Sequence, residues 1–116
     1  MTALRNLCAL FLVLIVVYTV IAISNVGIDL ITPFVGDILS AGWSGQFNLD
    51  FMMYLILSAL WVAWRHDFSG AGLALAVIAS VGGMLFFAAY LLVQIGRADG
   101  DVGKLLLGHR RAAARR

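Results

Sequence analysis

Three long stretches of the chain consist almost entirely of hydrophobic residues and are separated by polar segments. They cover about residues 3–24, 47–65 and 70–96. A membrane-spanning helix needs about 20 mainly apolar residues, because the hydrocarbon core of a bilayer is about 30 Å thick. In lipid the backbone hydrogen bonds must be made within each segment, so all three stretches are predicted to be helices. The pattern therefore predicts an all-α membrane protein with three transmembrane helices in a single domain, residues 1–116.

Residues 25–46 interrupt this pattern with two aspartates, a proline and several glycines. Their apolar residues recur at roughly helical spacing, and Trp43 follows them. This arrangement is typical of a short amphipathic helix that lies at the membrane interface. Pro33 suits the first turn of such a helix, because its missing N–H would have no partner there anyway. We therefore expect an interfacial loop with a short amphipathic segment.

The first apolar stretch also allows a second interpretation. Residues 1–6 include one arginine, as the start of a secretory signal peptide does, and Ala22-Ile23-Ser24 has the small residues of a cleavage site. The uncharged run is longer than the apolar core of most signal peptides. Its length favours a retained span, and the cleaved alternative stays open.

The composition supports a lipid environment and excludes several kinds of chemistry. Hydrophobic residues make up 63% of the chain and charged residues 12%, and a soluble domain of 116 residues could not bury so much apolar surface. The single cysteine, Cys8, excludes an intramolecular disulfide and a multi-cysteine metal site. His66 and His109 do not stand at metal-ligand spacing, and no nucleophile or phosphate-binding motif is present. We therefore predict neither an enzyme nor a metal, haem or other cofactor site.

The basic residues gather at the end of the chain. Six of the eight lie in the tail, residues 97–116. This tail is predicted to bind anionic lipid headgroups, at about 1 kcal/mol per basic residue, and not nucleic acid. Three crossings would place it opposite Arg5 and Arg65, and the positive-inside rule then favours a cytoplasmic tail in a bacterial inner membrane.

Polar and aromatic side chains share one face of the second stretch, at 100° per residue. They are Asp50, Tyr54, Ser58, Trp61 and Arg65. Asp50 and Arg65 are separated by about 22 Å of helix rise, so they cannot pair with each other.

The third stretch carries a matching face that begins with small residues, which let helices approach closely in lipid. That face continues with Gly83, Phe87, Tyr90, Gln94 and Arg97. If the second and third stretches form a straight antiparallel hairpin, the end that carries Asp50 meets Arg97. We therefore predict a helix contact along this seam, with Asp50 and Arg97 paired at one membrane surface.

The same residues carry a resemblance to known families. Asp50, Tyr54, Ser58-x-x-Trp61-x-x-x-Arg65, Gly83, Tyr90 and Gln94, followed by "GDVGKLLLG", resemble bacterial and plant families of small three-span integral membrane proteins of unknown function. The resemblance covers roughly the last 60 residues. It implies the three-span fold and supplies no activity.

Two functions are compatible with these observations. The first is an accessory or structural subunit of a larger membrane complex or a homo-oligomer, because so small a bundle leaves much of its surface to partners. The alternative is a protein that binds a lipid, a quinone or a pigment between the second and third stretches. The candidate binding residues for that site are Tyr54, Trp61, Phe87 and Tyr90.

Overall fold

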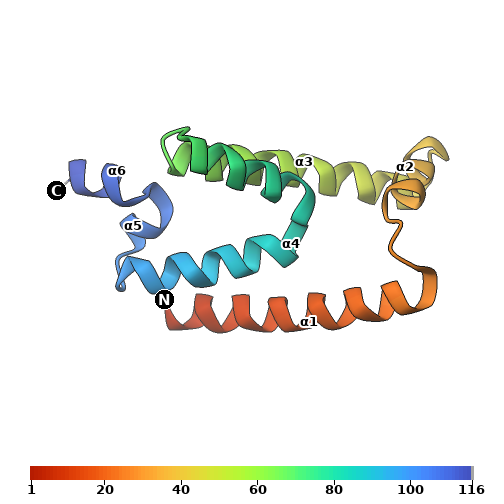
Figure 1. The fold of residues 1–116 in the computed structure, drawn as a ribbon, viewed down its shortest axis with the longest axis horizontal. Coiled ribbons are helices and arrows are strands. Elements are labelled where there is room, and N and C mark those ends of the chain that lie inside the picture. Colours follow the sequence, from red (N-terminus) through yellow and green to blue (C-terminus); the bar gives the residue numbers. More distant parts are fainter. Residues whose placement is uncertain (116) are drawn as a thin grey trace.

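The computed structural model describes residues 1–115, which contain six α-helices and no strand (Figure 1). Three of the helices are long and apolar enough to cross a membrane, which confirms the predicted all-α class. The helices are α1 (Thr2–Val26), α2 (Ile31–Leu39), α3 (Trp43–Arg65), α4 (Gly70–Ala98), α5 (Val102–Leu107) and α6 (His109–Ala114).

The short helix α2 lies in the predicted interfacial segment, with Pro33 in its first turn. The Asp29 carboxylate accepts a hydrogen bond from the backbone N–H of Thr32 at 3.2 Å, which satisfies one of the free donors at the start of the helix. α3 begins at Trp43, earlier than the sequence pattern indicated. Gly45 lies directly against the backbone of Asp37, so the absence of a side chain lets α2 and α3 approach closely.

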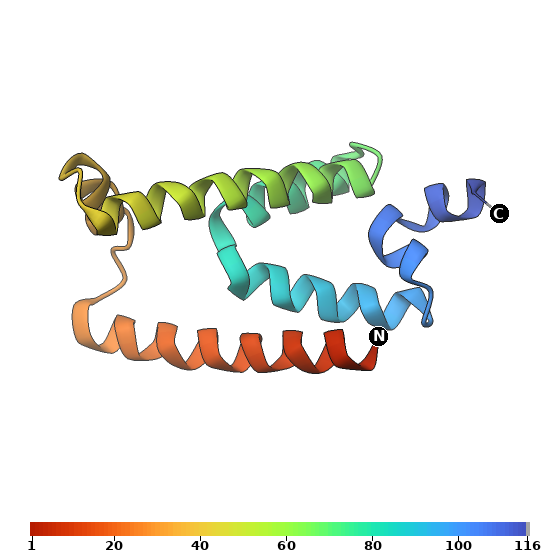
Figure 2. The same ribbon diagram turned by 180° about the vertical axis from the view of Figure 1, so that it is seen from behind.

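Helix α4 is broken at Gly83. Its φ of 56° and ψ of −145° lie in a region that is essentially restricted to glycine. A Cβ atom at Gly83 would lie 2.9 Å from the Phe51 ring of α3. Only seven residues later, the Tyr90 hydroxyl lies 3.2 Å from Arg65, at the far end of α3. The second half of α4 therefore runs back along the direction from which the first half came (Figure 2).

This reversal corrects the straight third helix assumed in the sequence-based hairpin. At 1.5 Å per residue, residues 70–82 rise about 20 Å and residues 84–98 about 22 Å. Neither half alone matches a hydrocarbon core of about 30 Å. α1 and α3, with 25 and 23 residues, rise about 38 Å and 35 Å without a break.

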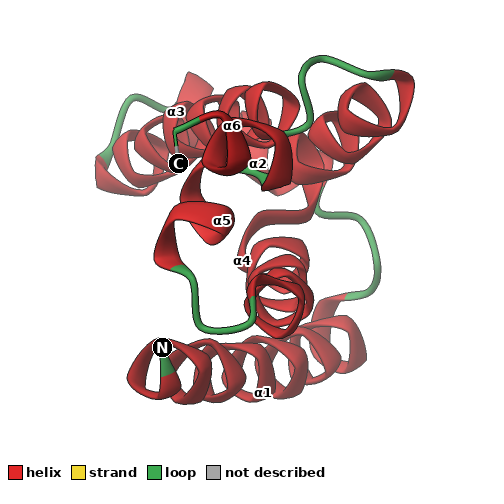
Figure 3. Ribbon diagram, turned by 90° about the vertical axis from the view of Figure 1, so that its left-hand side faces the viewer, coloured by secondary structure: helices red, strands yellow, loops and turns green. Residues whose placement is uncertain are grey.

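The packing brings the N-terminus and the tail to the same end of the molecule. α1 packs on α4, beside the half that follows Gly83 (Figures 1 and 2). Met1 packs against a buried cluster formed by Ile95, Ala98 and Leu105. Seen from that end, α5 and α6 lie across the ends of α3 and α4 (Figure 3).

Candidate functional site

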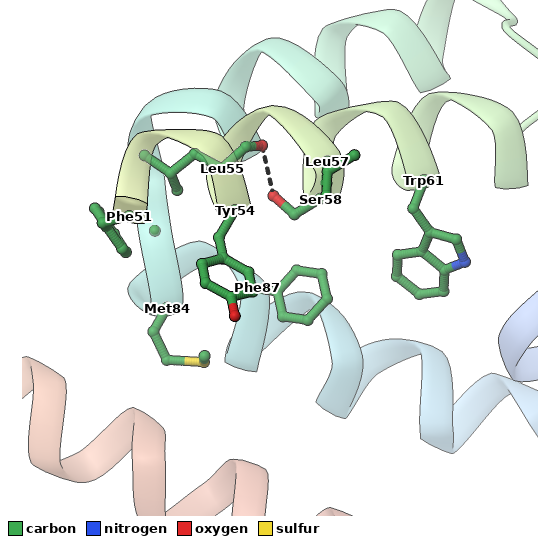
Figure 4. Close-up of a pocket in the computed structure, with 9 residues that line it drawn as sticks. Phe51, Tyr54, Leu55, Leu57, Ser58, Trp61, Met84 and Phe87 are labelled. Carbon is green, nitrogen blue, oxygen red and sulfur yellow. Dashed lines mark hydrogen bonds between the residues drawn. The ribbon is translucent and has the colours of Figure 1, made fainter. Parts of the chain in front are cut away.

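An apolar pocket of about 490 Å³ lies between α3 and the break in α4 (Figure 4). Gly83 lines it, because the reversal there draws the second half of α4 away from the middle of α3. The remaining lining is largely aromatic and aliphatic: Phe51, Tyr54, Leu55, Leu57, Ser58, Trp61, Met84 and Phe87.

Aromatic rings dominate the pocket wall. The rings of Trp61 and Phe87 lie 5.8 Å apart at an interplanar angle of 59°, a geometry that aromatic pairs favour. Tyr54 is 68% exposed, and its hydroxyl has no hydrogen-bond partner among the described residues 1–115. The Ser58 hydroxyl donates to the carbonyl of Leu55 at 2.8 Å, so its oxygen can still accept a hydrogen bond. Three of the four binding candidates from the sequence therefore meet in one pocket.

The fourth candidate, Tyr90, belongs to a polar cluster at the end of α3. Tyr90 is 6% exposed and does not line the apolar pocket. Its hydroxyl accepts a hydrogen bond from Arg65 Nη1 at 3.2 Å and lies 2.6 Å from His66 Nε2. The ring of Phe86 stacks on it at 5.6 Å. Tyr90 thus joins α4 to the end of α3.

Arg65 is buried, with 4% of its surface exposed, and its hydrogen bonds reach α5. Its Nε donates to the carbonyl of Leu105 at 2.6 Å and its Nη2 to that of Lys104 at 3.0 Å. The Trp61 indole donates to the carbonyl of Leu106 at 3.1 Å. The carbonyls of Leu105 and Leu106 belong to the last turn of a helix, where no intrahelical donor is available, whereas that of Lys104 also accepts from the backbone N–H of Gly108 at 3.1 Å. Two side chains of α3 therefore cap the C-terminus of α5.

α6 makes the reciprocal contact with α3. The Arg111 guanidinium donates to the carbonyl of Trp64 and lies 4.0 Å above the centre of the Trp64 ring. It also pairs with the Asp67 carboxylate at 3.1 Å, while Arg110 lies 3.8 Å from the same group. Hydrogen bonds and ion pairs thus hold the tail on the turn between α3 and α4.

The electrostatics of this end affect His66. Burial lowers the pKa of His66 below its usual 6.5, and the nearby charges of Arg65 and Arg97 lower it further, against a smaller opposing effect of Asp67. The neutral imidazole is therefore favoured where it meets the Tyr90 hydroxyl.

The predicted pair of Asp50 and Arg97 is wrong. Arg97 lines a cavity together with Arg65, His66 and Gln94. Asp50 lies on α3 next to Phe51, whose ring meets Gly83 at the other end of the seam. The prediction assumed an unbroken α4, and the reversal at Gly83 returns Arg97 to the end of α3 that carries Arg65.

Sequence reasoning missed the attachment of the tail, in which Asp67 pairs with Arg111, and it missed the contact of His66 with Tyr90. A signal for the helix inside the tail was present. Asp101 stands where a helix N-cap is favoured and accepts from the backbone N–H of Lys104 at 3.3 Å. Gly108, with a φ of 83°, stands where helices commonly end.

Comparison with known proteins gave no match to this chain among family models, curated proteins or solved structures.

Proposed function

We propose that this chain is a small multi-pass membrane protein that binds an apolar small molecule, such as a lipid, a quinone or a pigment, in the pocket beside Gly83. The observation that carries the proposal is the break in α4, which opens this pocket at mid-length of α3. Irregular backbone at membrane depth is tolerated only where protein buries it or where it lines a water-filled cavity. Gly83 lines the pocket, and an occupant would cover the break.

The shape and chemistry of the pocket suit such a ligand. Its volume of about 490 Å³ falls within the range of about 300–1,000 Å³ found for small-molecule sites. Trp61 and Phe87 offer ring faces and edges to a flat or extended apolar body. The hydroxyls of Tyr54 and Ser58 can meet one polar group, such as a carbonyl or hydroxyl.

The distribution of charge supports an orientation in the membrane. The basic residues among residues 1–115 lie on the N-terminal turn, at the end of α3 or from Arg97 onward, and the fold brings these segments to one end of the molecule. Asp29 and Asp37 lie at the opposite end. The positive-inside rule then favours a cytoplasmic location for both termini, with α1 and α3 crossing the bilayer and α4 entering and leaving on the same side. This topology puts Arg5 and the tail on the same side of the membrane, whereas three full crossings would put them on opposite sides.

Gentle extraction followed by mass spectrometry of the co-purifying small molecules tests the ligand proposal. We expect a bound apolar compound in the wild-type protein and its loss in Tyr54→Ala. Phe47→Ala is the matched control, because Phe47 is an exposed aromatic residue of the same helix that does not line this pocket. A well-folded wild-type protein that carries no small molecule, or equal retention in both variants, would contradict the proposal.

The accessory-subunit function stays a prediction that the same extraction tests. Recovery of the chain in a larger complex, with an empty pocket, would favour it over the binding function.

A further inference from the structure

A second cavity, of about 280 Å³, lies where α3 and the second half of α4 end beneath the tail. Its walls differ from those of the apolar pocket because charged and polar side chains dominate them. The residues on which the argument rests are Arg65, His66, Asp67, Gln94, Arg97 and Arg110. Three arginines face one aspartate there, so the cavity carries a positive potential.

Gln94 supplies an amide to the wall of this cavity. Only 5% of this residue is exposed, and it lines the cavity. In the part of the chain that the structure describes, residues 1–115, its side-chain amide has no hydrogen-bond partner. No fully buried side-chain nitrogen or oxygen atom among residues 1–115 lacks a partner, so the Gln94 amide is open to the cavity space and is not sealed inside the protein. A ligand with oxygen atoms could accept from its two N–H groups.

The charges around Gln94 define the kind of ligand. Arg65 uses three of its five N–H groups on Leu105, Lys104 and Tyr90, which leaves one on each terminal nitrogen. Arg97 is exposed at the rim of the cavity. Arginine guanidinium groups match phosphate oxygens in a planar, two-point geometry.

The one acid in the cavity does not cancel this potential. The Asp67 carboxylate is already engaged by Arg111 at 3.1 Å and by Arg110 at 3.8 Å. An incoming anion therefore meets guanidinium groups and the Gln94 amide, and not an unpaired carboxylate.

We propose that this cavity is a phosphate-binding site at the membrane surface that holds the headgroup of an anionic phospholipid. The site lies at the end of α3, beside Trp61 and Trp64, and tryptophans concentrate at membrane interfaces. Its 280 Å³ is below the usual range for drug-sized ligands, so it accommodates a headgroup while the acyl chains remain outside. A soluble phosphate compound shares this chemistry and is the second source that the experiment separates. The proposal is independent of what occupies the apolar pocket.

The test is a titration of the purified full-length protein with phosphatidylglycerol, with the bound lipid counted by native mass spectrometry. Gln94→Leu keeps the side-chain volume, removes the amide and changes no charge. We expect it to weaken binding about fivefold, the effect of one hydrogen bond. Arg97→Gln should weaken binding about tenfold, because it removes a charged contact.

Matched controls separate a defined site from general attraction to a basic surface. Gln46→Leu makes the same chemical change on an exposed glutamine at the opposite end of α3. Arg115→Gln removes a charge from the exposed end of the tail. The site predicts unchanged binding for Gln46→Leu and a clearly smaller loss for Arg115→Gln than for Arg97→Gln. Diacylglycerol, which has acyl chains but no phosphate, should not bind here.

Each outcome decides the proposal. No phosphatidylglycerol binding, binding that Gln94→Leu leaves unchanged, or equal losses in Arg97→Gln and Arg115→Gln would overturn it. If Gln94→Leu does not fold, the comparison of the two arginine variants decides alone, because both arginines are exposed. Displacement of the lipid by millimolar inorganic phosphate, with the same dependence on Gln94, would support the phosphate site and assign it to a soluble phosphate compound.

Discussion

Replacement of Gly83 by alanine tests whether α4 reverses at this residue, because a broken helix predicts a loss of stability and a straight helix predicts a gain. An alanine at a φ of 56° and a ψ of −145° costs about 1–3 kcal/mol in backbone strain. Its Cβ atom would also lie 2.9 Å from Phe51 Cζ, and a ring moved off its preferred rotamer costs about 0.5–1.5 kcal/mol. We therefore expect Gly83→Ala to lower the free energy of unfolding by about 2–4 kcal/mol.

Gly96 provides the matched control on the same helix. A Cβ atom there would meet nothing within 4 Å, and the residue has helical geometry. Alanine in place of glycine in a helix interior gains up to about 1 kcal/mol. Gly96→Ala should therefore stabilise the protein slightly. If residues 70–98 formed one straight helix, Gly83→Ala would stabilise it as well.

The measurement is unfolding in mixed micelles by titration with a denaturing detergent, followed by far-ultraviolet circular dichroism. The double variant Phe51→Leu with Gly83→Ala separates the steric cost from the backbone cost, because only the steric part depends on the ring. A stabilising Gly83→Ala, equal in sign to Gly96→Ala, would refute the broken helix and with it the pocket beside Gly83.

Three further outcomes are expected. In a cysteine-free background, single cysteines at Thr2 and Ala113 should react alike with a membrane-impermeant thiol reagent, and opposite accessibility would contradict the two-crossing topology. Arg65→Lys should destabilise the attachment of the tail by about 1.5–3 kcal/mol, because an ammonium cannot reproduce the guanidinium fork; faster proteolysis of the tail measures this, and an unchanged rate counts against the capping contact. Since burial lowers the pKa of His66, the stability it contributes is complete above pH 6.5 and is lost as the pH falls through its folded-state pKa. Thermal melting in detergent should therefore show an acid-side decline that His66→Gln reduces and His109→Gln leaves in place.

The sequence predicted the long helices well, because lipid imposes a simple requirement on length and composition. The pattern located three apolar segments and the short helix before Trp43, and all four are present. It missed the reversal at Gly83 because glycines within an apolar run are common in membrane helices and usually serve close packing. A single backbone conformation distinguishes a break from a packing groove, and hydropathy does not report it.

The sequence predicted the candidate site only in part, because only part of it depends on regular helix geometry. Tyr54 and Trp61 share a face of α3, and regular helix geometry predicts that face correctly. Phe87 joins them because it follows the break by only one turn. Tyr90 and Arg97 depend on the direction of the second half of α4, so an assumption of straightness placed them at the wrong end.

The hydrogen bonds of Arg65 also constrain the order in which this chain can reach its final structure. Arg65 is made before every group that satisfies it: Tyr90 follows 25 residues later, and the carbonyls of Lys104 and Leu105 follow 39 and 40 residues later. During synthesis its guanidinium must therefore stay in water or among headgroups, because burial without partners is costly. The end of α3 can become buried only after α5 has been made. A chain cut before residue 104 would keep Arg65 exposed beside Trp61 and Trp64. This exposed arginine would distinguish an incomplete chain from a complete one for cellular quality control.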